Sequence, residues 1–166
     1  MKTTPSAPLF QPDPDLFLAD LDAATVPELF AAFATALAGR GLAHDRDALA
    51  RVLLEREAIG TTATGQGLAL PHVRSHVVGA TQVAFARLRR PLEFGAADGL
   101  PVRAVLLLVA PYGALGALYT PLLAVLAAAA HDEADRLHLL EVESFADFDR
   151  VMRRTIRPRL QEVLAR

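Results

Sequence analysis

The stretch Gly65-Gln66-Gly67-Leu68-Ala69-Leu70-Pro71-His72-Val73-Arg74 lies near the middle of the chain and places a histidine directly after a proline. Its two glycines are typical of a turn, and the Leu/Ala run between them and the proline predicts a short apolar strand. Proline ends such a strand because it lacks a backbone N–H. We therefore expect the imidazole of His72 to stand at the exposed end of the strand, where it could act as a base, a nucleophile or a metal ligand.

Two amphipathic helices are predicted before this stretch, over residues 25–39 and 45–57. Thr25 and Asp45 have side chains that accept hydrogen bonds at helix N-termini, so each is expected to cap its helix. In the first helix, Thr25 is followed three residues later by Glu28, which is the spacing of a capping box.

Strands are predicted after this stretch over residues 81–88 and 102–109, and the second is a near-continuous run of Val, Leu and Ala. Such a run indicates a central strand covered on both faces. Helices are predicted over residues 121–130 with Thr120 as the cap, over residues 133–140, and from Ser144 onward, with Pro158 interrupting the tail. This order predicts an α/β fold in which a mixed β-sheet is sandwiched between helices.

The length of 166 residues favours one domain. Residues 1–14 contain four prolines and no apolar core segment, so they are predicted to be a flexible leader rather than a signal peptide. Residues 15–166 are predicted to form a single domain.

Composition and charge exclude several classes of function. The formal net charge is −2, which gives no reason to expect binding to nucleic acid or to an anionic membrane. The chain has no cysteine, which excludes disulfides, thiolate catalysis and cysteine-rich zinc sites and is compatible with a cytoplasmic protein.

Residues 104–130 carry no charge and are numerous enough to cross a bilayer. Pro111, Gly113 and Gly116 cut this run after the Val/Leu block, however. The prediction is therefore a buried strand, a loop and a buried helix, with no membrane insertion.

Residues on both sides of His72 have the chemistry of a phosphate-accepting site. Such a site needs a nucleophile, cations for the phosphoryl oxygens, and hydroxyl or backbone N–H donors. The sequence offers cations in Arg56 and Arg74, hydroxyls in Thr61 and Thr62, and close backbone approach at Gly65 and Gly67. Each feature also has an ordinary structural explanation as a helix-end charge, a turn or a loop residue, so the chemistry alone indicates an α/β domain with a candidate histidine site.

Other catalytic patterns are weak or absent. His72 and His76 have the spacing of a helical metal pair, but Pro71 argues against a helix and no Glu lies between the two histidines. Walker, dinucleotide-binding and Gly-x-Ser-x-Gly motifs are missing. We therefore expect neither a metal nor a cofactor.

Several blocks, in order, resemble a known family, the enzyme IIA domain of the bacterial phosphoenolpyruvate:sugar phosphotransferase system in its fructose/mannitol class. Leu54–Thr62 is similar to the family's "RE…(S/T)T" block, and Gly65–His72 is similar to its "G-x-G-(I/V)-A-(I/L)-P-H" signature. Arg87–Phe94 and Asp98–Val102 resemble the strand pair "P-(I/L)-x-F … D-G-x-P-V". The resemblance covers roughly residues 16–153 and is nearest to the stand-alone nitrogen-regulatory type.

The resemblance implies that His72 is the phosphorylated residue and takes phosphate from a histidine-containing phosphocarrier protein. Arg56 would then neutralise the phosphoryl oxygens, and Thr62 would donate a hydrogen bond to them. Arg74 is expected to add a second cation on the chemistry of the segment alone. Sugar-transport members of the family pass the phosphate to an enzyme IIB, whereas nitrogen-type members use it to regulate partner proteins. Both roles remain open, and the regulatory role is favoured because no membrane or IIB segment is fused to the domain.

The sequence departs from the family pattern in several places, and one of them bears on phosphate transfer. Many members have a second histidine at the start of the helix that follows the central strand, and Tyr119 occupies that position here. A tyrosine can donate a hydrogen bond to phosphate but cannot carry the imidazolium charge. A second hypothesis is therefore a binding or sensor module in which His72 is not phosphorylated and the surrounding surface, including the apolar loop at residues 112–119, docks a partner.

Overall fold

Strand β6 (Val102–Ala110) is the centre of a six-stranded mixed sheet in the computed structural model, which describes residues 10–166. On one side, β6 pairs antiparallel with β5 (Gln82–Leu92), and β5 pairs in parallel with β1 (Phe17–Leu21). On the other side, two short strands lie parallel to β6, one after the other: β3 (Leu68–Ala69) and β4 (His72–Arg74). Strand β2 (Ala63–Gly65) completes the sheet as the antiparallel partner of β3.

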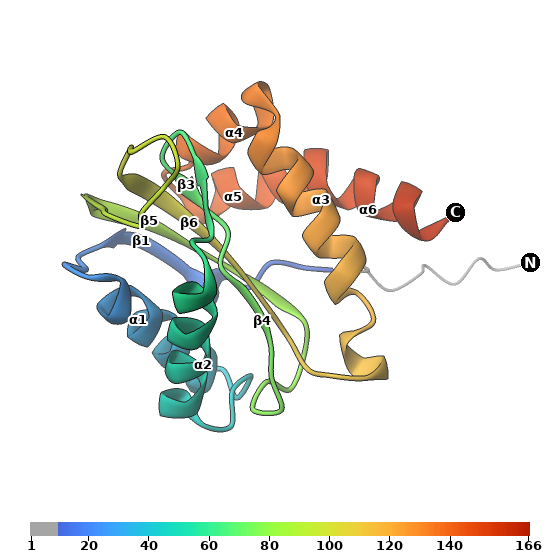
Figure 1. Ribbon diagram of the computed structural model, residues 1–166. Helices are drawn as coiled ribbons and strands as arrows, with labels where there is room; N and C mark the ends of the chain where they lie inside the picture. Colours follow the sequence, from blue (N-terminus) through green and yellow to red (C-terminus); the bar gives the residue numbers. More distant parts are fainter. Residues whose placement is uncertain (1–9) are drawn as a thin grey trace, which may run out of the picture.

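Helices cover both faces of this sheet (Figure 1). One layer consists of α1 (Val26–Gly39) and α2 (Arg46–Ile59). The other layer consists of α3 (Tyr119–His131), α4 (Glu133–Leu140), α5 (Phe145–Val151) and α6 (Arg157–Leu164). The predicted mixed sheet between helices is therefore confirmed.

The side chains of β6 alternate between two hydrophobic cores. Val105, Leu107 and Val109 belong to the core under α1 and α2, whereas Leu106 and Leu108 belong to the core under α3 and the C-terminal helices. All five side chains have no exposed surface. The Val/Leu/Ala run is therefore a central strand covered on both faces, as predicted.

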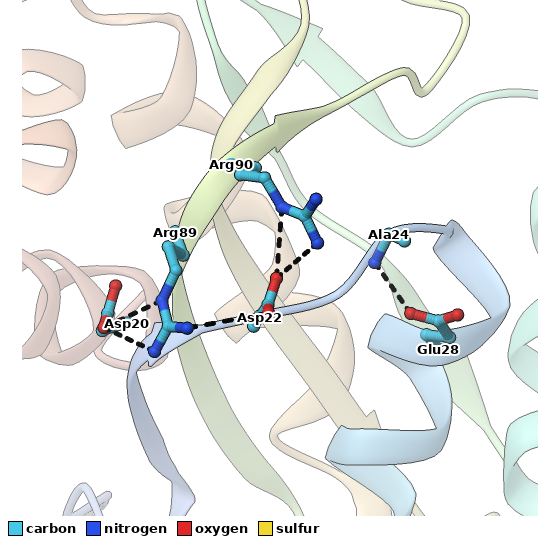
Figure 2. Close-up of polar contacts among 6 residues, drawn as sticks. All are labelled: Asp20, Asp22, Ala24, Glu28, Arg89 and Arg90. Carbon is cyan, nitrogen blue, oxygen red and sulfur yellow. Dashed lines mark hydrogen bonds and ion pairs between the residues drawn. The ribbon is translucent and has the colours of Figure 1, made fainter.

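Most of the predicted helix caps are confirmed. The Thr25 hydroxyl accepts the backbone N–H of Glu28, and the Glu28 carboxylate accepts the N–H of Ala24 (Figure 2). Asp45 caps α2, and Ser144 forms a complete capping box with Asp147 at the start of α5. The cap expected at Thr120 is wrong. Helix α3 begins two residues earlier than predicted, at Tyr119, because the Leu118 carbonyl already accepts the N–H of Leu122.

The prediction that Pro158 interrupts the C-terminal tail is also wrong. A π-helical segment, Met152–Ile156, joins α5 directly to α6. Pro158 is the second residue of α6, where a missing N–H is tolerated because the wider turn before it has already changed the hydrogen-bond pattern.

Some residues before the predicted domain boundary at residue 15 pack against the rest of the described chain. Phe10 is 7% exposed and packs into the core under the C-terminal helices, and its carbonyl accepts a hydrogen bond of 3.0 Å from the Arg157 guanidinium. A 3₁₀ turn follows at Pro14–Leu16. Phe10 and Pro12 of the predicted leader are thus buried, whereas Gln11 and Pro14 are exposed, and residues 1–9 lie outside the described residues.

Ion pairs connect β5 to the end of β1 and to the residue that follows it (Figure 2). The Arg89 guanidinium donates two hydrogen bonds of 2.9 and 3.1 Å to the Asp20 carboxylate, and Arg90 binds Asp22 in the same way at 2.7 and 3.2 Å. Asp20 has a φ of 53°, in the left-handed region. These exposed pairs are screened by solvent, so they fix the path of the chain more than they stabilise the fold.

The uncharged run predicted to be buried forms β6, a loop and α3. Leu122, Val125 and Leu126 of α3 are buried in the core. In the described part of the chain, one helical stretch, Ala114–His131, is long and apolar enough to cross a membrane, with a mean hydropathy of 1.6. A core helix has the same length and composition, and the inner face of α3 packs as a core helix does.

Candidate functional site

His72 is the first residue of β4, on the outer edge of β6. The structure corrects the expectation that Pro71 ends the strand. The Pro71 carbonyl still accepts the N–H of Leu108 at 3.0 Å, and pairing resumes with His72 opposite Leu108. A proline at a sheet edge removes one donor but leaves its acceptor in place, so the strand is interrupted only at Leu70 and Pro71, between β3 and β4.

The imidazole of His72 is half-buried and has one hydrogen bond to the protein. Its Nδ1 lies 2.8 Å from the carbonyl oxygen of Leu70. A carbonyl oxygen only accepts, so Nδ1 must carry the proton in this contact. The lone pair of the neutral ring is therefore on Nε2, which makes Nε2 the nucleophilic atom.

Two clefts flank the imidazole, with volumes of about 500 and 380 Å³. Both are lined by Arg56, His72 and Leu123. The larger cleft is completed by residues that include Arg74, Tyr112 and Tyr119, and the smaller by residues that include Thr62 and His131. His72 thus lies between the C-terminal end of α2 and the N-terminal half of α3.

Arg56 reaches the site from the last turn of α2. Its Nη1 donates a 3.0 Å hydrogen bond to the carbonyl of Gly60, the C-cap of this helix. Because a guanidinium has five N–H donors, this bond leaves others for an anion in the clefts. The structure brings Arg56 and His72 to the same clefts, as the predicted role requires.

Arg74 lies two residues beyond His72 on the same face of β4, whereas Val73 points into the core under α1 and α2. Its guanidinium carbon lies 5.6 and 5.4 Å from the ring centres of Tyr112 and Tyr119. Nε and Nη2 donate hydrogen bonds of 3.3 and 3.4 Å to the carbonyls of Pro111 and Gly113. Arg74 is therefore held beside the larger cleft by the loop that precedes α3.

Tyr119 lines the larger cleft at the first residue of α3. Burial raises the pKa of its phenol above the ordinary value of 10.0, against the opposing charges of Arg56 and Arg74. The phenol is therefore neutral at physiological pH and can donate a hydrogen bond, but it cannot carry a positive charge.

Thr62 lines the smaller cleft, but its donors are already used. Its hydroxyl lies 2.6 Å from Oε2 of Glu57, and its backbone N–H donates to Oε1 of the same carboxylate at 2.8 Å. The hydroxyl of Thr61 likewise donates to the carbonyl of Phe94 at 2.6 Å. In this arrangement neither threonine has a free hydroxyl proton for a phosphoryl oxygen.

The structure does not bring Gly65 and Gly67 to His72. Gly65, Gln66 and Gly67 all have positive φ and form the turn between β2 and β3. The carbonyl of Gly67 accepts from Arg103, whereas His72 pairs with Leu108 further along β6. About five residues of strand, roughly 16 Å, separate the two positions. The glycines shape a distant hairpin, so the prediction that they approach the phosphate is not supported.

Among residues 10–166, no group of three His, Asp or Glu side chains is arranged to hold a metal ion. His72 and His76 do not act as a pair, since the ring of His76 packs at a tilt against that of Tyr112, with ring centres 4.7 Å apart, while His72 bonds to Leu70.

Sequence reasoning missed three contributors to the site. Leu70 orients the imidazole through its carbonyl, which no side-chain pattern reveals. Gly116 lets the loop before α3 approach Arg74, because a Cβ there would overlap the carbonyl oxygen of Pro111. Glu57 was visible beside Arg56, but its partner Thr62 becomes apparent only when the chain is folded.

The chain is similar in sequence to several known proteins. A family model described as "Phosphoenolpyruvate-dependent sugar phosphotransferase system, EIIA 2" matches residues 12–154. A nitrogen regulatory protein of Bradyrhizobium diazoefficiens is 49% identical over 67 residues, 40% of this chain and 44% of that protein. The chain thus spans less than half of that relative. A fructose-specific EIIA component of Haloferax volcanii is 36% identical over 104 residues, 63% of this chain and 67% of that protein.

Solved structures show the same architecture. The nitrogen regulatory protein IIA-Ntr of Neisseria meningitidis superposes with a TM-score of 0.75 at 28% identity, over 84% of this chain and 94% of that one. Enzyme IIAMtl of Escherichia coli, solved in complex with phosphorylated enzyme IIBMtl, superposes with a TM-score of 0.70 over 87% of this chain and 99% of that one. At 20% identity, the second likeness concerns the fold alone.

Proposed function

Because the chain belongs to the EIIA 2 family of the phosphoenolpyruvate-dependent sugar phosphotransferase system, we propose that it is a phosphohistidine carrier with His72 as the acceptor. One observation carries the assignment of the residue. Nδ1 of His72 is committed to the Leu70 carbonyl, which leaves Nε2 as the free nitrogen of a ring that lines two clefts together with Arg56.

The transfer is an in-line displacement between two imidazoles. The Nε2 lone pair of His72 forms a bond to phosphorus, and the P–N bond of the donor phosphohistidine breaks, its electron pair returning to the donor imidazole. Nδ1 of His72 keeps its proton, so the phosphorylated ring is positively charged and the Leu70 carbonyl lies where it stabilises that charge. Because one P–N bond replaces another, the step is reversible.

Charge stabilisation and positioning carry such a reaction. Arg56 and Arg74 supply positive charge near the phosphoryl oxygens, and Tyr119 supplies a neutral O–H donor. In this account Thr62 is not a direct phosphate ligand. No step requires a cofactor or a metal ion.

The phosphate donor in this proposal is a histidine-containing phosphocarrier protein, and the reaction takes place in the cytoplasm. Apolar side chains border the site: Ile59, Leu115 and Tyr112 are 85, 77 and 52% exposed. Ile59 and Tyr112 line the larger cleft itself. Such a rim around a charged centre suits transient docking of another protein.

The recipient is either a regulated protein, as in nitrogen-type members, or a sugar-specific enzyme IIB. The Bradyrhizobium and Neisseria relatives favour nitrogen-type regulation, whereas the Haloferax relative favours sugar transfer. Incubating the phosphorylated chain with candidate IIB proteins separates the two, because only the sugar role predicts that the phosphate moves to a IIB protein.

Phosphorylation by the complete system tests the proposal. The chain is incubated with phosphoenolpyruvate, enzyme I and the phosphocarrier protein, and its intact mass is recorded at alkaline pH. We expect one added phosphate on the wild type and on His138→Ala, which changes an exposed histidine lining neither cleft, and none on His72→Ala. Labelling of a control enzyme IIA but not of this chain would favour the binding module in which Tyr119 replaces an imidazole. Tyr119→His would then restore labelling.

A further inference from the structure

The carboxylate of Glu57 is attached to Thr62 at two points. Oε1 accepts the Thr62 backbone N–H at 2.8 Å, and Oε2 accepts the Thr62 hydroxyl at 2.6 Å. Both are charge-assisted hydrogen bonds, which are stronger than bonds between neutral groups. Thr62 is only 6% exposed, so water does not readily replace either bond. Glu57 therefore fixes the position of the chain where α2 leads into β2.

The hydrogen bonds continue from Thr62 to the imidazole. The Thr62 carbonyl accepts the backbone N–H of Leu70 at 3.0 Å, and the Leu70 carbonyl accepts Nδ1–H of His72 at 2.8 Å. Leu70 is 3% exposed and lies next to Pro71, which has no N–H of its own. Four hydrogen bonds thus join Glu57 to the ring of His72 through Thr62 and Leu70.

We propose that Glu57 is a positioning residue for phosphoryl transfer, acting through Thr62 and Leu70 to hold His72 as the Nδ1–H tautomer with Nε2 aimed into the clefts. This inference rests on the proposed function. Removing the carboxylate leaves two buried donors of Thr62 without partners, and the segment moves to satisfy them. The carbonyl of Leu70 then loses its fixed place, and Nδ1 loses its acceptor.

Thr62 could act in two ways, by positioning the imidazole or by binding phosphate directly, and its contacts distinguish the two roles. A hydroxyl has one proton to donate, and that of Thr62 is donated to Glu57. If Thr62 acts by positioning, its removal changes the imidazole before any phosphate arrives. If Thr62 binds phosphate, its removal slows transfer and leaves the unphosphorylated ring unchanged.

The test uses Glu57→Ala, Thr62→Val, their double variant and Thr62→Ser. Thr62→Val removes the hydroxyl bond to Oε2 of Glu57 but keeps the backbone bond to Oε1. It therefore tests the contact between Glu57 and Thr62 even if Glu57→Ala folds poorly. The ¹⁵N signals of the His72 imidazole give its tautomer in the unphosphorylated protein, and the kinetics of phosphorylation by the phosphocarrier give kcat and KM separately.

We expect Glu57→Ala to lower kcat about tenfold with little change in KM, by analogy with the outer partners that orient metal-ligating histidines. The His72 signals should shift from the Nδ1–H tautomer toward a mixture in both single variants, whereas Thr62→Ser should retain the wild-type signals and rate. The double variant should be no slower than Glu57→Ala alone, because Glu57→Ala already removes both hydrogen bonds between residue 57 and Thr62, including the one that Thr62→Val removes.

Asp47→Ala is the matched control, since it removes an exposed carboxylate from the first turn of the same helix. Unchanged imidazole signals in Glu57→Ala and Thr62→Val would overturn the inference. A wild-type chain that accepts no phosphate would instead overturn the proposed function, while the tautomer measurement would still test the role of Glu57.

Discussion

Nδ1 of His72 lies 2.8 Å from the carbonyl oxygen of Leu70, so the two ring nitrogens have different environments. The contact commits Nδ1–H and leaves Nε2 free to react. Leu70 lies two residues before His72, and the carbonyl of Pro71 between them is bonded to β6. The short segment thus sets the orientation of the imidazole.

The linkage of phosphate to the ring follows from this contact. We expect phosphohistidine bonded at Nε2, with Nδ1 still protonated and bonded to Leu70. Two-dimensional ³¹P–¹⁵N or ¹H–¹⁵N NMR of the phosphorylated protein assigns the nitrogen. Phosphate on Nδ1 would require the bond to Leu70 to break and would contradict this account of the site.

Removing the guanidinium of Arg56 should slow phosphorylation without unfolding the protein. We expect Arg56→Ala to lower the rate about 10²-fold, the size of effect seen when one donor to a developing anion is removed. The phosphorylation rate of Arg56→Lys should lie between those of the wild type and Arg56→Ala, because lysine keeps the positive charge but lacks the planar fork of donors. Arg51→Ala, an exposed change on the same helix, is the control for α2. Equal rates in Arg56→Ala and Arg51→Ala would exclude Arg56 from the transfer.

The phenol of Tyr119 should act as a neutral donor. Tyr119→Phe removes one hydrogen bond worth about 1 kcal/mol, so the transfer rate should fall by tenfold or less. Because burial raises the pKa of Tyr119 above 10.0, the ratio of wild-type to Tyr119→Phe rates should stay constant across neutral pH. A ratio that titrates near neutrality, measured by single-turnover phosphorylation, would refute this role.

The carboxylate of Asp98 should stabilise the folded protein at pH values above the ordinary pKa of 3.8. Hydrogen bonds from the backbone N–H groups of Gln66 and Leu100 lower the pKa of this carboxyl in the folded protein. A lowered folded pKa means that the contribution is present above pH 3.8 and is lost as the pH falls through the folded value. Asp98→Asn should therefore lower the Tm at neutral pH, and the difference should shrink in acid.

Thermal unfolding followed by circular dichroism over a pH series measures this difference. Phosphorylation of Asp98→Asn should be unchanged at a temperature where it is folded, because Asp98 holds the hairpin at the far end of β3 from His72. A Tm difference that grows in acid would have the wrong sign for this mechanism.

Sequence patterns predicted the strands and helix starts that depend on residues close together in the sequence. The Val/Leu/Ala run of β6 indicated a strand covered on both faces, and Thr25, Asp45 and Ser144 marked helix starts because each cap depends on a few neighbouring residues. His72, Arg56 and Arg74 could be selected for the same reason, since their chemistry is visible in the side chain itself.

Long-range pairing could not be predicted in the same way. The glycines at 65 and 67 indicated a turn correctly, but their distance from His72 depends on which part of β6 each segment pairs with. Thr62 was assigned to phosphate because its hydroxyl was visible, whereas its bond to Glu57 exists only in the folded chain. Pro71 was expected to end the strand, because its missing N–H is visible in the sequence and the pairing of its carbonyl with Leu108 is not.

Direct transfer between two purified proteins tests the central claim most simply. The phosphocarrier protein is phosphorylated, freed of phosphoenolpyruvate and enzyme I, and mixed with this chain while the intact masses of both are followed. We predict that phosphate leaves the carrier and appears on the wild-type chain one for one, and that His72→Ala receives none. Transfer to His72→Ala at the wild-type rate would contradict the assignment of His72 as the acceptor.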